Sequence, residues 1–471
     1  MYLSDLFEEA PMIKITGITS DTRFLQPGDL FIPQKGSNFD EGDFIIEAIQ
    51  KGAAAILTAK PHYNATIPII VRKNSFDELK RCLNFFYGAP WNQIKMIGVT
   101  GTDGKTTTSS MFNHIINSFS SCAYIGTNGI KYKNNHFKNY FTTPPLSENY
   151  RLIDLFSKEN IQYLALEVSS QGIVNHRIED ILFDYTIFTN LSHEHLDTHK
   201  TMENYFLSKL ELFKQLKPKG KILVNNDDEY APRFSEFNDV ITFGIYNYAD
   251  YRAENIRYGN KYTTFDLQTP SYMLKNIKIN RNEEYNIYNV LPAIIIGLFE
   301  KMPINTLYKA VATIPVVDGR LELISTNTPF KIYIDFAHTP NALANVLSNL
   351  KRKTKGNLIV VCGAAGKKDP TKRPLIGKIA CEIADMVIFT SEDPRTESPE
   401  DIIKDLQKEV RTSNYKSIID RYSAIKEGIS LAKPNDTVIV TGKGRETTAE
   451  IGDTIYNYSD VESIFNILNE Q

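Results

Sequence analysis

The sequence predicts an α/β protein of three domains built on parallel sheets. The chain has 471 residues, and one domain usually holds about 100–200 residues. Short apolar runs alternate with helical segments and end in polar or glycine-rich turns, which is typical of parallel sheets covered by helices. The breaker segment Gly88-Ala89-Pro90-Trp91 indicates a linker. We therefore expect domains at 1–88, 89–314 and 315–471.

Composition and charge exclude several classes of protein. Hydrophobic residues make up 42% and charged residues 23% of the chain, which excludes a disordered or fibrous protein. The net charge of −3 argues against a dedicated nucleic-acid binder. Four widely spaced cysteines argue against a zinc site or a disulfide framework and fit a reducing cytoplasm. We expect no signal peptide and no membrane span, because no apolar run approaches about 18 residues.

The apolar runs place the strands and helices in order along the chain. The first block is predicted to hold a helix at Phe44–Lys51 and a strand at Ala54–Leu57. In the second block, helices are predicted from about Thr106 and over Glu203–Leu216, and strands over Met96–Thr100, Tyr163–Val168 and Tyr185–Thr189. Strands of the third block are predicted at Ile332–Ile334, Leu358–Val361, Met386–Phe389 and Thr437–Val440. Ligands of open α/β sheets bind beyond the carboxyl ends of the strands, so the turns there are the candidate sites.

The strongest motif follows the first strand of the central block and reads Gly101-Thr102-Asp103-Gly104-Lys105-Thr106-Thr107-Thr108. Glycines let backbone N–H groups wrap around a phosphate, and the helix N-terminus adds a favourable dipole. Lys105 can reach the terminal phosphates, and the Thr106 hydroxyl can bind Mg²⁺. The spacing is T-G-T-x-G-K-T rather than the generic G-x-x-x-x-G-K-T. We expect this loop to bind the phosphates of ATP.

Three further features are less specific by themselves. Glu167 ends a buried strand and needs a partner, which a metal ion or solvent could provide. Three His, one Glu and one Asp lie within His193–His199, but their spacing does not suit a zinc site. A single imidazole assisting Mg²⁺, with the other residues positioning a loop, is the simpler interpretation. Lys209 lies on the amphipathic segment Glu203–Leu216, and this pattern alone favours a solvated surface lysine.

Together these motifs resemble the Mur ligase family, the ATP-dependent amide-forming ligases of peptidoglycan synthesis, over essentially the whole chain. The resemblance implies a small UDP-binding domain, a central ATPase domain with a P-loop and a C-terminal Rossmann-like domain for ADP and the incoming amino acid. It is closest to the branch that adds a diamino acid to UDP-N-acetylmuramoyl-L-alanyl-D-glutamate through an acyl phosphate. ATP and Mg²⁺ would be the cofactors, and we expect a monomer.

The resemblance also implies roles for individual residues. The uridine-nucleotide segment would be Ser20-Asp21-Thr22-Arg23, Pro27-Gly28-Asp29-Leu30-Phe31 and Gln34-Lys35-Gly36. Residues for the muramoyl peptide would be Thr142, Thr143, Ser169, Asn175 and Arg177. The catalytic set would be Lys105, Glu167, His195 and Lys209, with Thr106, Glu167, His195 and a carbamylated Lys209, from Y-x-x-x-K, as Mg²⁺ neighbours. ATP would also contact Asn286, Asn289, Arg320, Asp335 and His338. The amino acid would meet Lys368, Asp393, Arg395, Gly442 and Glu446.

Several positions depart from the family pattern. Glu194 replaces the usual Asp before His195, Lys368 the usual Arg, and Arg445 the His of G-K-G-H-E. The specificity motif D-N-P-R reads Glu392-Asp393-Pro394-Arg395. These swaps mostly keep charge or hydrogen-bonding type.

The identity of the amino acid stays open between two kinds of substrate. Arg395 favours meso-diaminopimelate, because a guanidinium can hold its distal carboxylate in a bidentate pair. Asp393 favours the more cationic L-lysine or L-ornithine. The alternative role for Arg395 is that of an ion-pair partner of Asp393 or Glu397 only.

Three rival functions also remain. A ligase paralogue of another pathway would keep the same motifs. A folylpolyglutamate synthetase would lack the UDP domain, so the segment Ser20–Phe31 argues against it. A non-catalytic scaffold would not need the intact catalytic set.

Overall fold

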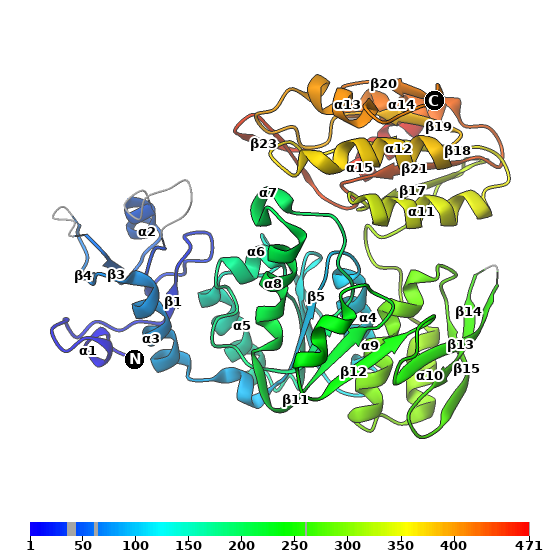
Figure 1. Cartoon of the computed structure of the whole chain (residues 1–471). Helices are drawn as coiled ribbons and strands as arrows, with labels where there is room; N and C mark the ends of the chain where they lie inside the picture. Colours follow the sequence, from blue (N-terminus) through cyan, green and yellow to red (C-terminus); the bar gives the residue numbers. More distant parts are fainter. Residues whose placement is uncertain (35–43, 61–64, 260, 471) are drawn as a thin grey trace.

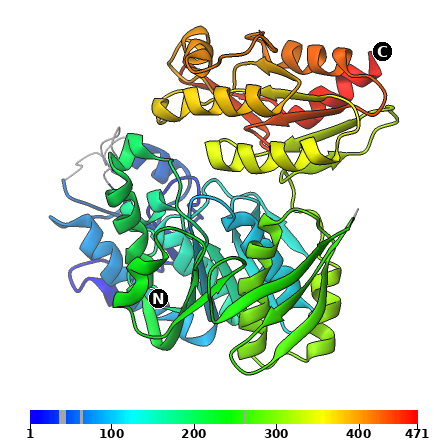
Figure 2. The same cartoon turned by 45° about the vertical axis from the view of Figure 1, so that its right-hand side comes forward.

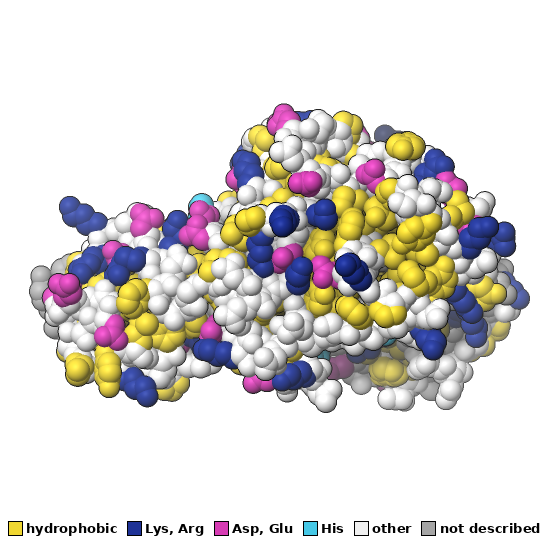
Figure 3. Space-filling view, turned by 90° about the horizontal axis from the view of Figure 1, so that it is seen from below, with side chains coloured by type: hydrophobic (Ala, Val, Ile, Leu, Met, Phe, Trp, Pro, Cys, Tyr) yellow, Lys and Arg dark blue, Asp and Glu magenta, His cyan; other side chains and the backbone are white. Residues whose placement is uncertain are grey.

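The computed structural model describes residues 1–34, 44–60, 65–259 and 261–470 and has a mixed α/β architecture of three domains. The N-terminal domain lies beside the central domain, and the C-terminal domain lies above the central domain (Figures 1 and 2). Among the described residues, no helix is long and apolar enough to cross a membrane. Seen from below, hydrophobic side chains gather over the central domain on the side that carries α10 (Figure 3).

The N-terminal domain is a small parallel sheet with helices. In the described part of this domain, the strands lie in the order β1 (Gly17–Thr19), β2 (Asp29–Phe31), β3 (Ala55–Thr58) and β4 (Ile69–Val71). Its helices are α1 (Leu3–Leu6), α2 (Ile45–Gln50) and α3 (Ser75–Tyr87), so the helix predicted at Phe44–Lys51 is confirmed. Asn74 caps α3 by accepting a hydrogen bond from the backbone N–H of Asp77. Lys35 and Gly36, predicted to continue the uridine signature, lie outside the described residues.

The central domain is a sheet whose described strands follow the order β15-β14-β13-β12-β11-β10-β5-β9-β6-β7-β8. The strands that carry the site are parallel: β5 (Lys95–Thr100), β6 (Cys122–Gly126), β9 (Tyr163–Glu167), β10 (Phe183–Phe188), β11 (Leu216–Asn225) and β12 (Val240–Gly244). Antiparallel hairpins extend both edges with β7 (Gly129–Tyr132), β8 (Asn135–Phe137), β13 (Tyr251–Tyr258), β14 (Thr263–Gln268) and β15 (Met273–Ile279).

Alternating side chains of these strands build two cores, one on each face of the sheet. On β9, Leu164 and Leu166 belong to one core and Ala165 to the other, as the two-residue period of a strand requires. The first face is covered by α5 (Leu146–Lys158) and α8 (Met202–Phe213), with α6 (Ser170–Val174) and α7 (Leu196–His199) beside α8. The second face is covered by α4 (Lys105–Asn117), α9 (Tyr285–Phe299) and α10 (Ile304–Ala312).

The predicted helix Glu203–Leu216 was too long at its C-terminal end. Helix α8 stops at Phe213, and Leu216 already pairs with Phe183 of β10 as the first residue of β11. Apolar residues continue through this boundary, so periodicity alone did not mark it.

The C-terminal domain is a second parallel sheet between two layers of helices. Its described strands lie in the order β16 (Glu322–Ile324), β17 (Lys331–Asp335), β21 (Thr437–Thr441), β18 (Leu358–Cys362), β19 (Met386–Phe389) and β20 (Tyr415–Ser417), with only β16 antiparallel. Helices α11 (Pro340–Lys353), α12 (Arg373–Ile383) and α13 (Pro399–Gln407) cover one face, and α14 (Arg421–Leu431) and α15 (Asp460–Asn469) the other. A hairpin, β22 (Thr448–Ile451) and β23 (Thr454–Asn457), precedes α15.

Candidate active site

The loop between β5 and α4 is shaped by two glycines with positive φ. Gly101 has φ +149° and Gly104 φ +85°. A Cβ on Gly101 would lie 1.9 Å from Thr189 Oγ1 and 2.9 Å from the Asn190 carbonyl oxygen. No larger residue fits there. The loop therefore turns tightly into α4, as a phosphate-binding strand–loop–helix requires.

A half-buried lysine, Lys105, and a buried lysine, Lys209, meet at this loop. Lys105 Nζ donates to the carbonyl oxygens of Gly101 (2.9 Å) and Thr102 (2.8 Å), and Lys209 Nζ donates to Gly101 O at 2.8 Å. Burial lowers the pKa of both lysines, and the Lys105 charge lowers the pKa of Lys209 further. Lys209 is 1% exposed, so the interpretation as a solvated surface lysine was wrong. Within the described chain neither ammonium group has a carboxylate hydrogen-bond partner.

Glu167 lies at the end of β9 and is surrounded by hydrogen-bond donors. Its carboxylate accepts from Thr106 Oγ1 (2.9 Å), from the backbone N–H of Thr127 (3.2 Å) and from the Tyr124 hydroxyl. Arg320 Nη2 reaches Thr106 Oγ1 at 3.2 Å. The carboxylate and hydroxyl oxygens suit a hard cation such as Mg²⁺.

His195 offers one imidazole near the two lysines. Its backbone is left-handed (φ +58°), and its buried Nδ1 has no hydrogen-bond partner. Burial, together with the charges of Lys209 and Lys105, lowers its pKa to about 2, so the ring is neutral and able to act as a ligand. Within the described residues no group of three or more His, Cys, Asp or Glu side chains could hold a metal. A Mg²⁺ ion here would need the hydroxyl of Thr106 and oxygens of its substrates as well.

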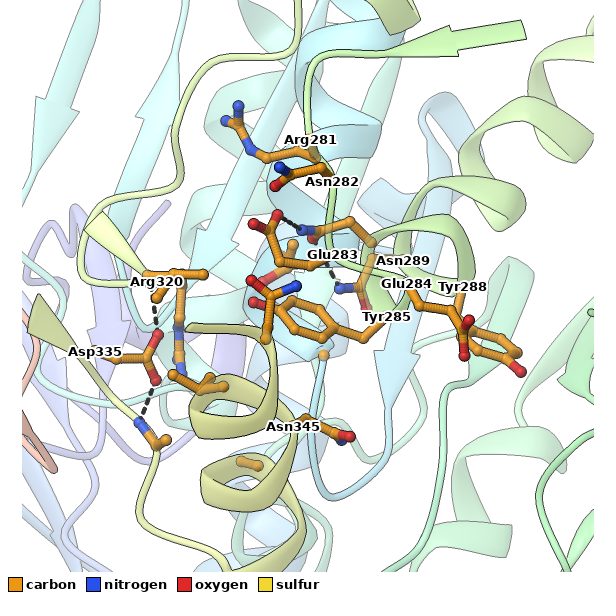
Figure 4. Close-up of a pocket in the computed structure, with 18 of the residues that line it drawn as sticks. Arg281, Asn282, Glu283, Glu284, Tyr285, Tyr288, Asn289, Arg320, Asp335 and Asn345 are labelled. Atoms are coloured by element: carbon orange, nitrogen blue, oxygen red, sulfur yellow. Dashed lines mark hydrogen bonds between the residues drawn. The ribbon is translucent and has the colours of Figure 1, made fainter. Parts of the chain in front are cut away.

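A cavity of about 1300 Å³ opens between the central and C-terminal domains. Its lining includes eight of the residues expected to bind ATP: Asp103, Gly104, Thr107, Asn286, Asn289, Arg320, Asp335 and His338. In Figure 4, Tyr285 and Asn289 lie on one side of this cavity and Arg320 and Asp335 on the other. The remaining expected residues, Gly101, Thr102, Lys105 and Thr106, belong to the adjoining loop. The cavity is thus continuous with the phosphate-binding loop and wide enough for a nucleotide.

Several lining residues were missed by sequence reasoning. Tyr285 and Tyr288 flank Asn286 and Asn289 at the start of α9, and this proximity was the available signal. Lys353, at the end of α11, pairs with Glu283 of the central domain at 2.6 Å. Its position in a basic last turn looked like ordinary helix-end charge, so the sequence held no signal for this contact.

The amino-acid residues expected in the C-terminal domain gather beyond β19 and β21. Arg395 Nε donates to Glu450 Oε2 at 2.6 Å and its Nη1 to the carbonyl oxygen of Gly366 at 2.6 Å. Lys443 Nζ lies 2.9 and 3.0 Å from the Asp393 oxygens and 2.9 Å from Glu446 Oε2. The interpretation of Arg395 as a partner of Asp393 or Glu397 was therefore wrong.

Other residues of this cluster are also placed by close contacts. A Cβ on Gly442 would lie 2.2 Å from Glu392 Oε2, so only glycine fits. Burial raises the pKa of Glu392 to about 7 and lowers that of Lys368.

Arg177, expected to meet the muramoyl peptide, and Arg23, expected in the uridine-nucleotide segment, share an aromatic ring that the sequence did not single out. The guanidinium carbons of Arg23 and Arg177 lie 4.6 and 4.2 Å from the centre of the Phe141 ring. Thr143 Oγ1 lies 3.1 Å from Ser169 Oγ and donates to the Glu167 carbonyl oxygen. These contacts join Arg23 of the N-terminal domain to the end of β9.

The remaining predicted substrate residues have more local partners. Ser20 contacts Ser147 from its backbone N–H (3.1 Å) and hydroxyl (3.0 Å). Thr142 Oγ1 lies 3.0 Å from Thr127 Oγ1. Asn175 is exposed, and its amide donates to the carbonyl oxygen of Gln171.

Family models match this chain in three consecutive stretches: "Mur ligase family, catalytic domain" at 14–84, "Mur ligase middle domain" at 99–297 and "Mur ligase, glutamate ligase domain" at 319–444. A UDP-N-acetylmuramoyl-L-alanyl-D-glutamate–2,6-diaminopimelate ligase from Bacillus velezensis is 38% identical over 458 residues, covering 95% of this chain and 93% of its own. The chain belongs to the Mur ligase family. It is an ATP-dependent ligase of the acid–amino-acid type.

Solved structures agree with the fold of this Mur ligase. A structure of a UDP-N-acetylmuramoyl-L-alanyl-D-glutamate–2,6-diaminopimelate ligase is 27% identical, with a TM-score of 0.61 and coverage of 100% of this chain and 99% of its own. A Mur ligase from Thermotoga maritima, solved in complex with ADP, shares the fold at 16% identity, with a TM-score of 0.70 and coverage of 96% and 97%. Both likenesses span all three domains.

Proposed function

We propose that this Mur ligase adds meso-diaminopimelate to UDP-N-acetylmuramoyl-L-alanyl-D-glutamate in the cytoplasm, with residues 1–88 binding the uridine nucleotide, 89–314 ATP, and 315–471 the amino acid and ADP. The observation that carries the choice of amino acid is the pairing of Asp393 with Lys443. This pair balances the charge that had favoured L-lysine, and leaves Arg395 as the group that distinguishes the two substrates. Relatives named as diaminopimelate ligases support the same choice.

The reaction would begin at the loop 101–106. The γ-phosphate of ATP is transferred in line to the D-glutamate carboxylate, and Lys105 stabilises the charge on the transferring group. The resulting acyl phosphate then accepts the amine of the diamino acid, and phosphate leaves. Thr106, Glu167, His195 and a carbamylated Lys209 would hold Mg²⁺, which would neutralise phosphate charge. The lowered pKa of Lys209 keeps its amine neutral at lower pH, and the neutral amine is the form that reacts with CO₂.

Steady-state kinetics with purified enzyme, UDP-N-acetylmuramoyl-L-alanyl-D-glutamate and ATP test this function. We expect a higher kcat/KM for meso-diaminopimelate than for L-lysine or L-ornithine. A higher value for either monocarboxylic diamino acid would overturn the choice of substrate, and no amide product with any of the three would overturn the function.

The role of Lys209 has its own test. Lys209→Ala should lose most activity and recover part of it with added short carboxylates, which can occupy the place of the carbamate oxygens. Lys214→Ala, at an exposed lysine on the next turn (59% exposed), is the matched control and should keep normal activity with or without carboxylate. Full activity of Lys209→Ala without any addition would contradict the assignment.

A further inference from the structure

A buried ion pair joins the central domain to the C-terminal domain. Lys372 Nζ lies 2.8 Å from both carboxylate oxygens of Glu194. Each side chain is only 4% exposed, although the two residues lie 178 positions apart in the chain. Glu194 directly precedes α7, which faces the C-terminal domain in Figure 1. Neither residue lines the nucleotide cavity.

Neighbouring side chains extend this junction. His193 Nε2 lies 3.0 Å from Asp369 Oδ2 and 2.8 Å from Thr371 Oγ1. The segment before His195 is thereby held against the segment that follows Lys368. One end of the junction therefore adjoins a proposed metal neighbour and the other a proposed amino-acid residue.

The free energy of burying an ion pair makes this contact sensitive to how the two domains are placed. Two paired charges can stay buried, but one charge left alone in the same place is strongly unfavourable. In an open arrangement of the domains, both side chains would be solvated and neither would depend on the other. The pair therefore favours one register of the two domains, a role for which buried polar pairs are best attested.

We propose that Glu194 and Lys372 are positioning residues that set the register of the C-terminal domain on the central domain for amide formation. With the domains in this register, the amine held near Arg395 faces the acyl phosphate formed at the loop 101–106, and water is kept from it. The assignment rests on the proposed function for its reaction. Because neither residue lines the nucleotide cavity, loss of the pair should weaken amide formation more than nucleotide binding.

A double-mutant cycle in the full-length enzyme tests this assignment: Glu194→Gln, Lys372→Met and both together. Each single variant should lower kcat/KM for the diamino acid by tenfold or more. ADP affinity should fall by a smaller factor than kcat/KM, because the central-domain residues that line the nucleotide cavity are unchanged. ATP hydrolysis per amide formed should rise, because the acyl phosphate meets water. The double variant should be no worse than the poorer single variant, because it leaves no unpaired buried charge. Losses that multiply in the double variant, or an unchanged ratio of hydrolysis to amide in the single variants, would overturn the proposal.

A direct measure of domain closure separates positioning from general stability. Dyes on Lys214→Cys and Lys404→Cys, both at exposed lysines, report the distance between the two domains, since all four native cysteines are buried. We expect substrates to close the parent enzyme fully and the single variants only partly. Glu203→Gln, which breaks an exposed pair with Arg233 inside the central domain, is the control and should close normally. Full closure of the single variants would overturn the assignment.

If the parent enzyme makes no amide product with any of the three diamino acids, the proposed function fails. The distance measurement with ATP still tests the role of the ion pair in domain closure, independently of which amino acid is used.

Discussion

The two ends of the candidate active site differ in whether their positively charged side chains are paired with carboxylates. At the loop 101–106, the half-buried Lys105 and the buried Lys209 donate to carbonyl oxygens of the loop. At the amino-acid end, Arg395 is paired with Glu450, and Lys443 with Asp393 and Glu446. We call the first the unbalanced end, because neither ammonium group there has a carboxylate hydrogen-bond partner among the described residues. We call the second the balanced end, because its cations are directly paired.

This difference matches the charges of the expected ligands. The unbalanced end suits polyanionic phosphates, because the Lys105 ammonium and a Mg²⁺ ion held with the help of a carbamylated Lys209 would both offset phosphate charge. The balanced end suits a zwitterion, because a diamino dicarboxylic acid brings equal numbers of positive and negative groups. Selectivity there depends on the positions of paired groups rather than on net charge.

The largest effect should follow from removing a charge at the unbalanced end. Lys105→Ala should lower the rate of ADP formation by about 10³-fold, because one lost donor to a charged transition state costs about 10²–10³ in rate. The variant should unfold at no lower urea concentration than the parent, since an unpaired buried charge is removed. Ligation at a near-normal rate would show that the loop does not bind the transferring phosphate.

A smaller effect should follow at the balanced end. Arg395→Ala should lower kcat/KM for meso-diaminopimelate by about 10–100-fold, the range for a lost hydrogen bond between charged groups. The kcat/KM for L-lysine should change less, because this substrate has no distal carboxylate. Glu450→Gln should give an intermediate loss, since the Gly366 carbonyl oxygen still holds the guanidinium. Equal losses for both amino acids would mean that Arg395 only stabilises the loop.

Local patterns predicted the strands, the strand–loop–helix around Lys105 and the polar turns that follow the strands. These features depend on residues that are close in the sequence, so the eight-residue motif around Lys105 was enough to predict the loop and the helix after it. The burial of Lys209 and the partner of Arg395 depend on contacts across 108 and 55 positions. Periodicity cannot report such contacts, because the same amphipathic helix can turn a lysine toward solvent or toward a loop. Phe141 was missed for the same reason, because its contacts are with Arg23 and Arg177, which belong to different domains.

The comparison also predicts how stability depends on pH. Burial lowers the pKa of Lys209 below its ordinary value of 10.5. Between the folded-state pKa and 10.5 the unfolded chain therefore holds more protons, and stability rises with pH in this window. Lys209→Met removes this cost, so the variant should be more stable than the parent at neutral pH, by a margin that shrinks toward pH 10.5. Urea unfolding of the parent and of Lys209→Met in CO₂-free buffers from pH 7 to 10 measures the stability difference and its change with pH. A stability difference between the two proteins that grows with pH would contradict the lowered pKa of Lys209.

The smallest effect should come from restoring a family residue at the rim of the balanced end. Arg445 pairs with Glu322, but its side chain is 50% exposed, and ion pairs in such positions contribute about 0–1 kcal/mol. Arg445→His should therefore change the free energy of unfolding by less than about 1 kcal/mol and activity by less than about twofold. Glu322→Ala should cost more, because Glu322 also accepts a hydrogen bond from the buried backbone N–H of Gly319 at 2.8 Å. If Arg445→His lowers stability or activity more than Glu322→Ala does, the Arg445 cation itself takes part in the reaction. Its pairing with Glu322 would then not explain its role.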